Sequence, residues 1–130
     1  MTKTILIVED ENPLRNALKD KLNKVGFATL EAKNGQEGLE LAISKTPDLI
    51  LLDIIMPVMD GFTMVKKLRE EENKNGKLTS NQIPILFLTN LSDEKALSEG
   101  QQEGIYDYLV KSNWTLDGIV KKIDDKLNLK

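Results

Sequence analysis

Short runs of apolar residues recur along the chain and are separated by more polar segments. The runs at 5–8, 48–52 and 84–88 are dominated by Ile, Leu and Val and show no regular alternation of apolar and polar positions. This pattern is typical of strands that are buried on both faces of a parallel sheet. The segments 27–32 and 105–110 predict two further strands, so five strands are expected in all.

The segments between these runs have the apolar spacing of helices. Leu14, Leu18 and Leu22 share one face of a first helix, with Asn12 as its expected N-cap and Gly26 as its end. Four further helices are expected to begin near positions 34, 61, 92 and 115, and the polar stretch 70–82 is expected to be a frayed helix end and a solvated loop. Five strands that alternate with five helices predict an α/β fold with a parallel sheet covered on both faces.

Length and composition indicate one folded domain. The chain has 130 residues, of which 40% are hydrophobic, and 18 basic residues against 21 acidic ones give a net charge of −3. This balance favours neither nucleic acid nor an acidic membrane surface as a partner. Cys and His are absent from the sequence, which excludes Cys/His zinc sites and catalysis by Ser-His or Cys-His pairs. There is no signal peptide and no run long enough to span a membrane, so a cytoplasmic protein is expected.

Polar residues of reactive types follow four of the predicted strands. Glu9 and Asp10 follow the first strand, Asp53 the third, Thr89 the fourth and Lys111 the fifth. The carboxyl ends of parallel strands lie along one edge of the sheet, which is where ligands bind. If the first and third strands are neighbours, three carboxylates meet at this edge. A hard cation, Mg²⁺ or alternatively Mn²⁺, would relieve their repulsion.

A metal-bound aspartate beside a lysine and a hydroxyl has the chemistry of a phosphoryl acceptor. Asp53 would attack in line, Lys111 and the cation would neutralise the transferring oxygens, and the Thr89 hydroxyl would bind one of them. A single Asp or Thr after a strand is more often a turn, cap or local hydrogen-bonding residue. Because every member of this set follows a strand at the same edge, a shared site is the stronger interpretation.

Four segments of the chain resemble, in order and spacing, the receiver domain of two-component response regulators. They are ILIVEDE at 5–11, LLDIIMPVMDG at 51–61, FLT at 87–89 and YLVK at 108–111. The likeness covers the whole chain, and the long motif that contains Asp53 is its most specific part. It implies a flavodoxin-like, doubly wound sheet of five parallel strands in the order 2-1-3-4-5 with five helices, and a single receiver domain over residues 1–130.

The resemblance also implies where a phosphoryl group and a metal ion would bind. Asp53 would accept a phosphoryl group from a sensor histidine kinase or a histidine phosphotransfer protein. Asp10, Asp53 and the backbone carbonyl of Ile55 would bind Mg²⁺, and Glu9 would act through water. Such a domain is a switch rather than an enzyme, with slow self-dephosphorylation as its one catalytic step.

A switching mechanism follows from the same resemblance. Thr89 would turn toward the phosphoryl group, Tyr108 would follow it inward, and Lys111 would pair with the phosphoryl oxygens. The added charge of about −2 would bias two conformations of the domain. The output surface would be the fourth helix, fifth strand and fifth helix, which would bind a downstream protein or a second copy of the chain after phosphorylation.

Several positions depart from the pattern of this family. Ser112 stands where a proline is usual, so a trans bond after Lys111 and a reshaped loop are expected. Asn90 replaces a very small residue, and it would either narrow access to the acceptor or add a hydrogen bond to it. Ile55 and Leu91 are apolar where the family admits or orients water, which predicts a long-lived phosphoryl-aspartate.

Two other functions compete with a phosphorylation switch. A receiver fold could serve as a docking or dimerisation module that needs no phosphate. A Mg²⁺-dependent phosphatase could use Asp53 as a transient nucleophile, but it would need a second acid two residues later, where Ile55 stands.

Overall fold

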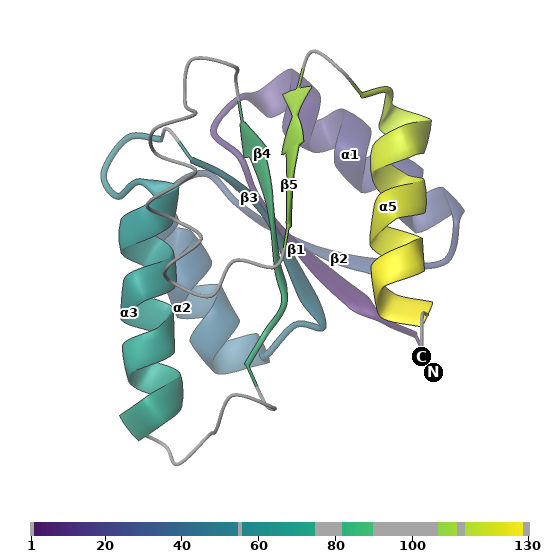
Figure 1. Cartoon of the computed structure of the whole chain (residues 1–130). Helices are drawn as coiled ribbons and strands as arrows, with labels where there is room; N and C mark the ends of the chain where they lie inside the picture. The colour runs from purple at the N-terminus through teal and green to yellow at the C-terminus, as the bar shows by residue number, and fades with distance from the viewer. Residues whose placement is uncertain (1, 55, 75–81, 90–106, 112–113, 129–130) are drawn as a thin grey trace.

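A computed structural model describes residues 2–54, 56–74, 82–89, 107–111 and 114–128. The strands are β1 (Thr4–Val8), β2 (Ala28–Ala32), β3 (Leu49–Asp53), β4 (Ile85–Thr89) and β5 (Asp107–Val110), and the helices are α1 (Asn12–Lys24), α2 (Gly35–Lys45), α3 (Gly61–Lys74) and α5 (Leu116–Asn128). All strands pair in parallel in one sheet with the order β2-β1-β3-β4-β5. Helices α1 and α5 cover one face and α2 and α3 cover the other (Figure 1). The predicted fold class and strand order are confirmed, and the helix expected at 92–103 lies outside the described residues.

Each face of the sheet has its own apolar core. The core under α2 and α3 contains Leu6, Val8, Ile50, Leu52, Phe87, Met64, Val65 and Leu68. The core under α1 and α5 contains Ile5, Ile7, Leu49, Leu51, Leu18, Leu22, Ile119 and Ile123. Successive residues of β1 and β3 therefore enter opposite cores, because side chains alternate across a strand. This burial on both faces explains why their sequences are continuously apolar.

The pairing register brings the strand ends to one edge. Val8 of β1 pairs with Leu52 of β3, so Glu9 and Asp53 follow on neighbouring strands. Thr89, the last residue of β4, pairs with Val110 of β5, and Lys111 comes directly after it. The edge predicted to carry the reactive side chains is thus formed by the ends of β1, β3, β4 and β5.

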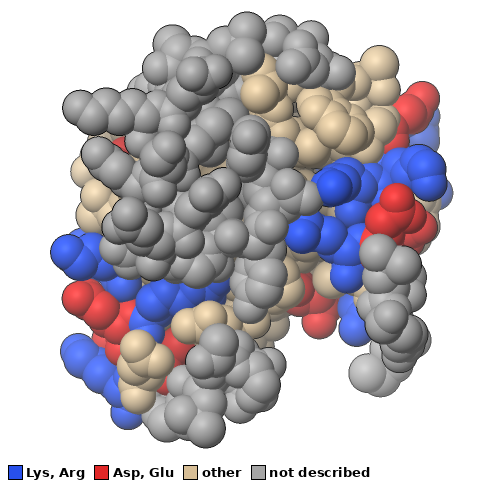
Figure 2. Space-filling model, viewed as in Figure 1, with Lys and Arg blue, Asp and Glu red and all other residues tan. Residues whose placement is uncertain are grey.

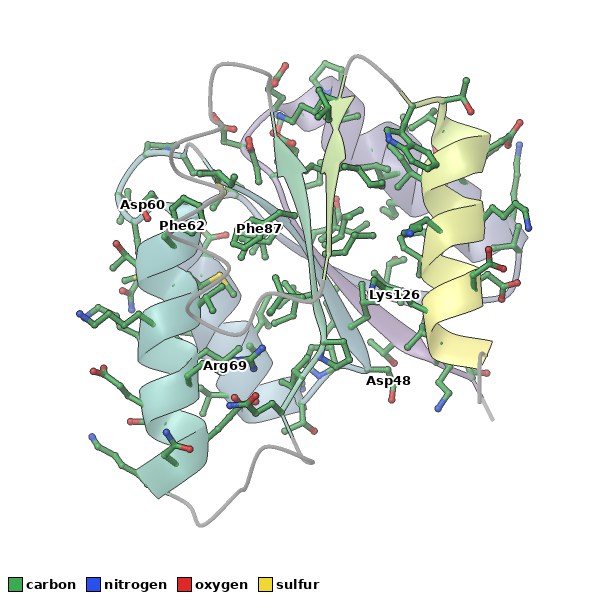
Figure 3. All side chains as sticks on the ribbon, in the orientation of Figure 1. Asp48, Asp60, Phe62, Arg69, Phe87 and Lys126 are labelled. Carbon is green, nitrogen blue, oxygen red and sulfur yellow. The ribbon has the colours of Figure 1, made fainter. Side chains whose placement is uncertain are left out.

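A buried ion pair in the C-terminal half of α3 joins this helix to the segment before β4. Arg69 donates a hydrogen bond to Oε1 of Glu72 at 2.8 Å and another to the carbonyl oxygen of Ile83 at 3.0 Å. The second carboxylate oxygen of Glu72 accepts from the backbone N–H of Ile83 at 3.0 Å. Glu72 is only 4% exposed, so the prediction of a frayed, solvated helix end is wrong at this residue. Figure 3 shows Arg69 on the inner side of α3, toward the sheet.

Charged side chains on the surface are mixed in sign. In the view of Figure 2, both acidic and basic groups lie over the described parts of α3 and α5. This arrangement agrees with the near balance of charges in the sequence. Within the described ranges, no helix has the length and apolar character needed to cross a membrane.

Candidate functional site

Three carboxylates meet at the carboxyl edge of the sheet. Glu9 and Asp10 follow β1, and Asp53 ends β3. Each offers one oxygen, and these oxygens all lie within 4.8 Å of one another. Glu9 and Asp53 are buried, whereas Asp10 is exposed, so the cluster opens to solvent on one side. The cluster predicted from the strand ends is therefore present.

Lys111 brings a positive charge into this cluster from the end of β5. Its ammonium donates a hydrogen bond to Oδ2 of Asp53 at 3.2 Å. It also lies 3.2 Å from Oε1 of Glu9 and 3.6 Å from Oε1 of Glu11. One cation thus serves three carboxylates, and Glu11 is a member that the sequence analysis did not single out.

Burial and mutual repulsion alter the acidity of these groups. Burial, with the charge of Asp53 in addition, raises the pKa of Glu9 to about 7. Burial also raises the pKa of Asp53, although Lys111 works against this shift. Burial works to lower the pKa of Lys111, but the charges of Asp53 and Glu9 outweigh it and raise that pKa. Burial therefore disfavours the ionised forms of both carboxyls, and a proton or a cation relieves this cost.

This donor set fits a hard divalent cation. Oε1 of Glu9 is buried and accepts no hydrogen bond from a described residue, and the nearby charge is the Lys111 ammonium at 3.2 Å, which it shares with Asp53. A buried carboxylate oxygen without such a donor is costly unless a charge satisfies it. Carboxylate oxygens are the ligands that Mg²⁺ prefers. Glu9, Asp10 and Asp53 would hold such an ion at this edge.

The loop after β3 folds back tightly beneath Asp53. The N–H of Gly61 donates to the carbonyl oxygen of Ile54 at 2.7 Å. A Cβ at position 61 would lie 2.6 Å from the carbonyl oxygen of Asp53, so only glycine allows this approach. Asp60 then caps α3 by accepting from the N–H of Thr63 at 2.8 Å. The Asp-Gly pair of the motif thus turns the chain and starts the next helix.

Val58, in the same loop, has a strained backbone. Its φ is 69°, and its side chain is 81% exposed. Left-handed backbone costs an L-residue about 1–2 kcal/mol, with β-branched residues the least tolerated and Asn among the most tolerated. We therefore expect Val58→Asn to raise the free energy of unfolding by about 1 kcal/mol in urea denaturation. Val25→Asn is the control, because Val25 is also exposed but has a φ of −92°; an equal gain there would contradict this account.

The structure places some predicted site residues and leaves others undescribed. Glu9, Asp10, Asp53 and Lys111 are brought together as expected. Thr89 and Tyr108 lie in β4 and β5, but their side chains lie outside the described part of the chain, as does the whole of Ile55, Asn90, Leu91 and Ser112. The predictions that concern these side chains and the bond after Lys111 stay predictions.

Arg15 is a site neighbour that sequence reasoning missed. It is 7% exposed and donates to the carbonyl oxygen of Glu9 at 2.7 Å. Asn12, expected to cap α1, makes no such bond, because the helix begins after Glu11 and Asn12 instead accepts from the Arg15 guanidinium. A signal existed in the sequence: position 15 precedes Leu18 and Leu22 at helical spacing, so it lies on the buried face.

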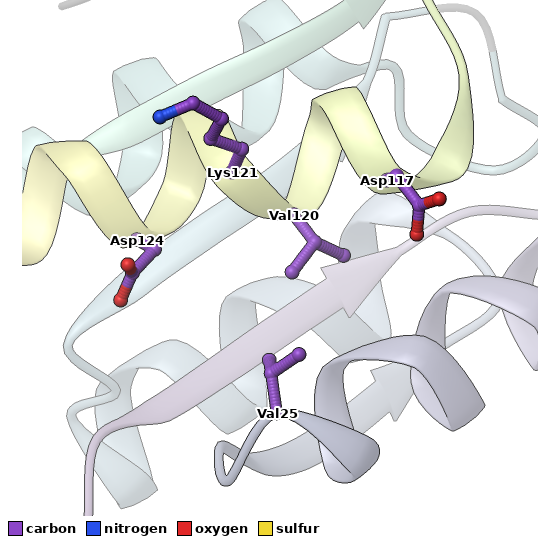
Figure 4. Close-up of a pocket in the computed structure, with 5 residues that line it drawn as sticks. All are labelled: Val25, Asp117, Val120, Lys121 and Asp124. Carbon is purple, nitrogen blue, oxygen red and sulfur yellow. The ribbon is translucent and has the colours of Figure 1, made fainter.

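A separate pocket lies away from this site. It has a volume of about 290 Å³ and is formed between Val25 at the end of α1 and one side of α5. Figure 4 shows its lining residues Val25, Asp117, Val120, Lys121 and Asp124. It contains none of the clustered carboxylates, so it has no part in their chemistry.

Comparison with known proteins identifies the family to which this arrangement belongs. Residues 5–124 match the family model of the response regulator receiver domain. The chain belongs to this family. The transcriptional regulatory protein SrrA of Staphylococcus aureus is 41% identical over 111 residues, which is 85% of this chain and 42% of SrrA. The chain therefore spans about two-fifths of the length of the curated relatives that it matches.

Solved structures of receiver domains have the same fold. The chemotaxis protein CheY4 of Vibrio cholerae is 28% identical and has a TM-score of 0.82, with 98% of this chain and 99% of that chain covered. The Francisella response regulator 1452 receiver domain is 26% identical with a TM-score of 0.79, over 95% and 94% of the two chains. The receiver domain is a module of two-component signalling, and its family generally uses Mg²⁺ at an acidic site like this one.

Proposed function

We propose that this receiver domain accepts a phosphoryl group on Asp53 in a Mg²⁺-dependent step, from a sensor histidine kinase or a histidine phosphotransfer protein. The observation that carries the proposal is the position of Lys111 Nζ, 3.2 Å from the Asp53 carboxylate within a cluster of three acids. An ammonium at that place can pair with transferring oxygens as well as with the acceptor. The domain then acts as a switch and not as a turnover enzyme.

Each residue has a distinct part in the proposed transfer. An oxygen of Asp53 forms a bond to phosphorus as the bond from phosphorus to the donor imidazole nitrogen breaks, and the imidazole leaves. Lys111 neutralises the transferring oxygens. Asp10, Asp53 and the backbone carbonyl of Ile55 hold the cation, and Glu9 acts through water. Bound Mg²⁺, or Mn²⁺, would supply further charge neutralisation at these oxygens.

The proposed output begins with the charge that the phosphoryl group adds. A phosphoryl group brings about −1.5 to −2 charge and three acceptor oxygens into a site that is already acidic. Thr89 and Tyr108 are the proposed switch residues, in β4 and β5, which pair directly. The responding surface comprises β5, α5 and the helix expected at 92–103, and it would bind a downstream protein or a second phosphorylated copy. Residues 1–130 act as one domain in this scheme, placed in the cytoplasm.

The experiment that tests the acceptor is intact-mass spectrometry after incubation with acetyl phosphate and Mg²⁺. We expect one added phosphoryl group, no addition to Asp53→Asn, and no addition with a chelator. Asp117→Asn is the matched control, because that carboxylate is 81% exposed and pairs with Lys21, which is not part of the cluster; it should be phosphorylated normally. Phosphorylation of Asp53→Asn at the normal rate would contradict the proposal, and loss in both variants would point to a damaged fold.

A beryllofluoride complex separates the switch from a docking module. If the domain is a switch, beryllofluoride should bind at Asp53 with Mg²⁺ and shift the NMR resonances of β5 and α5. A docking module would show neither binding nor shifts. Sustained release of phosphate from a small substrate would instead favour the phosphatase.

The phosphoryl group on Asp53 is expected to be long-lived. The side chains at positions 55 and 91 are apolar and can neither orient nor activate a water molecule. Following the loss of phosphate by mass after removal of the donor should give slow decay, and Ile55→Glu should accelerate it. A half-life of seconds that other substitutions at these two positions do not lengthen would contradict this expectation.

A further inference from the structure

Arg15 is a buried cation beside the acidic site, and none of the proposed steps uses it. Its guanidinium donates to the carbonyl oxygen of Glu9 at 2.7 Å, to Oε1 of Glu31 at 3.3 Å, and to Oδ1 of Asn12. These acceptors belong to the end of β1, to β2 and to the first turn of α1. The Arg15 guanidinium therefore links the end of β1, strand β2 and the first turn of α1, next to the carboxylate cluster.

The backbone around Glu9 is held on both sides. The N–H of Glu9 donates to the carbonyl oxygen of Ala32 at 3.1 Å. The N–H of Arg15 donates to the carbonyl oxygen of Glu11 at 2.9 Å. Oε2 of Glu9 accepts from the N–H of Glu11 at 3.1 Å. The carbonyl oxygen of Glu9 accepts from the Arg15 side chain at 2.7 Å. Because that carbonyl lies in the peptide plane that joins Glu9 to Asp10, holding it fixes how the two carboxylates are presented.

The charge of Arg15 is already paired outside the site. Glu31 lies 3.3 Å from Nε of Arg15 and is 32% exposed, and Lys19 also approaches Glu31 at 3.5 Å. The site carboxylates instead have Lys111 as their cation. The contacts of Arg15 therefore point to an effect through the geometry of the loop rather than through its charge.

We infer that Arg15 is a positioning residue for the metal ion: it holds the peptide between Glu9 and Asp10 so that both carboxylates meet Asp53. The inference rests on the proposed function, since it requires that these three residues bind Mg²⁺. Groups that hold metal ligands in place typically change metal affinity 10- to 100-fold when they are removed. We expect the Mg²⁺ dissociation constant of Arg15→Met to rise by roughly 10-fold.

The test is calorimetric titration of the unphosphorylated domain with Mg²⁺, with Arg69→Met as the matched control. Arg69 is also 7% exposed, and it likewise donates to a backbone carbonyl and to a carboxylate, but at the other end of the sheet. Both variants should lose stability in urea, while only Arg15→Met should bind Mg²⁺ more weakly. Equal Mg²⁺ affinities in the two variants would overturn the inference.

A milder variant keeps the test decisive if Arg15→Met does not fold. Asn12→Ala removes one acceptor of the guanidinium without removing its charge, and it should weaken Mg²⁺ binding by a few-fold; unchanged affinity there would overturn the inference.

The Mg²⁺ concentration for half-maximal phosphorylation by acetyl phosphate should rise with the dissociation constant, while the rate at saturating Mg²⁺ stays that of the unaltered domain. An unaltered domain that shows no Mg²⁺ binding would overturn the proposed function and this inference together, whereas normal binding by every variant would overturn the inference alone.

Discussion

Replacing Glu72 by Ala is expected to lower the free energy of unfolding by about 3–5 kcal/mol. The substitution removes the carboxylate that pairs with Arg69 at 2.8 Å and accepts from the N–H of Ile83 at 3.0 Å. The buried guanidinium would lose its ion pair with Glu72, and the N–H of Ile83 would lose its acceptor. Both losses are costly because water does not replace the missing group. Urea denaturation followed by circular dichroism measures the change.

Glu71 supplies the control for this measurement. It is the adjacent residue of α3, and its ion pair with Lys74 has a distance of 3.5 Å at the surface, with Lys74 73% exposed. Exposed pairs of this kind contribute about 0–1 kcal/mol. Glu71→Ala should therefore change stability little, and similar losses from the two substitutions would show that burial of the Arg69 pair has no special effect.

The metal-free domain is expected to lose stability as the pH rises from 4.5 to about 7. Glu9 has a pKa of about 7 in the folded chain against 4.5 without the fold, so within this window the folded state binds more protons than the unfolded state. The free energy of unfolding then falls with rising pH, by at most about 3 kcal/mol. The raised pKa of Asp53 acts in the same direction, while that of Lys111 acts only at alkaline pH. Urea denaturation in chelator at several pH values measures the slope.

Two variants separate Glu9 from other sources of pH dependence. Glu9→Gln cannot ionise, so its slope should be smaller and its stability above pH 7 greater than that of the unaltered domain. Glu70→Gln, at an exposed position of α3, should leave the slope unchanged. Saturating Mg²⁺ should reverse the slope, because metal and protons compete for the carboxylates. A metal-free domain whose stability rises through this window would contradict the burial of an ionisable Glu9.

The apolar pattern was enough to predict the sheet. Continuous runs such as 5–8 and 48–52 can be buried only where both faces are covered, so they imply helices on both sides. Strand ends then locate Glu9, Asp10, Asp53 and Lys111 at one edge. The strand order came from the resemblance to a family, since periodicity does not specify which strands are neighbours.

Contacts of long polar side chains could not be predicted in the same way. Helical spacing places Arg15 on the buried face of its helix, but it does not show that Glu31 is its partner, and nothing in the local pattern shows that Glu72 binds the N–H of Ile83. Nor does a turn motif reveal that Val58 has a positive φ. Such details arise from tertiary packing, which local composition does not encode.

The separation of Asp53 and Lys111 along the chain has a consequence for folding. Their hydrogen bond joins residues 58 positions apart, and Lys111 reaches the site only when β5 has paired at the edge of the sheet. Contacts between distant segments form slowly, because closing the intervening chain costs entropy. During synthesis on the ribosome, the acids of β1 and β3 therefore emerge well before their ammonium partner. Under the function proposed above, competence to receive a phosphoryl group thus marks a chain whose folding has reached the last strand.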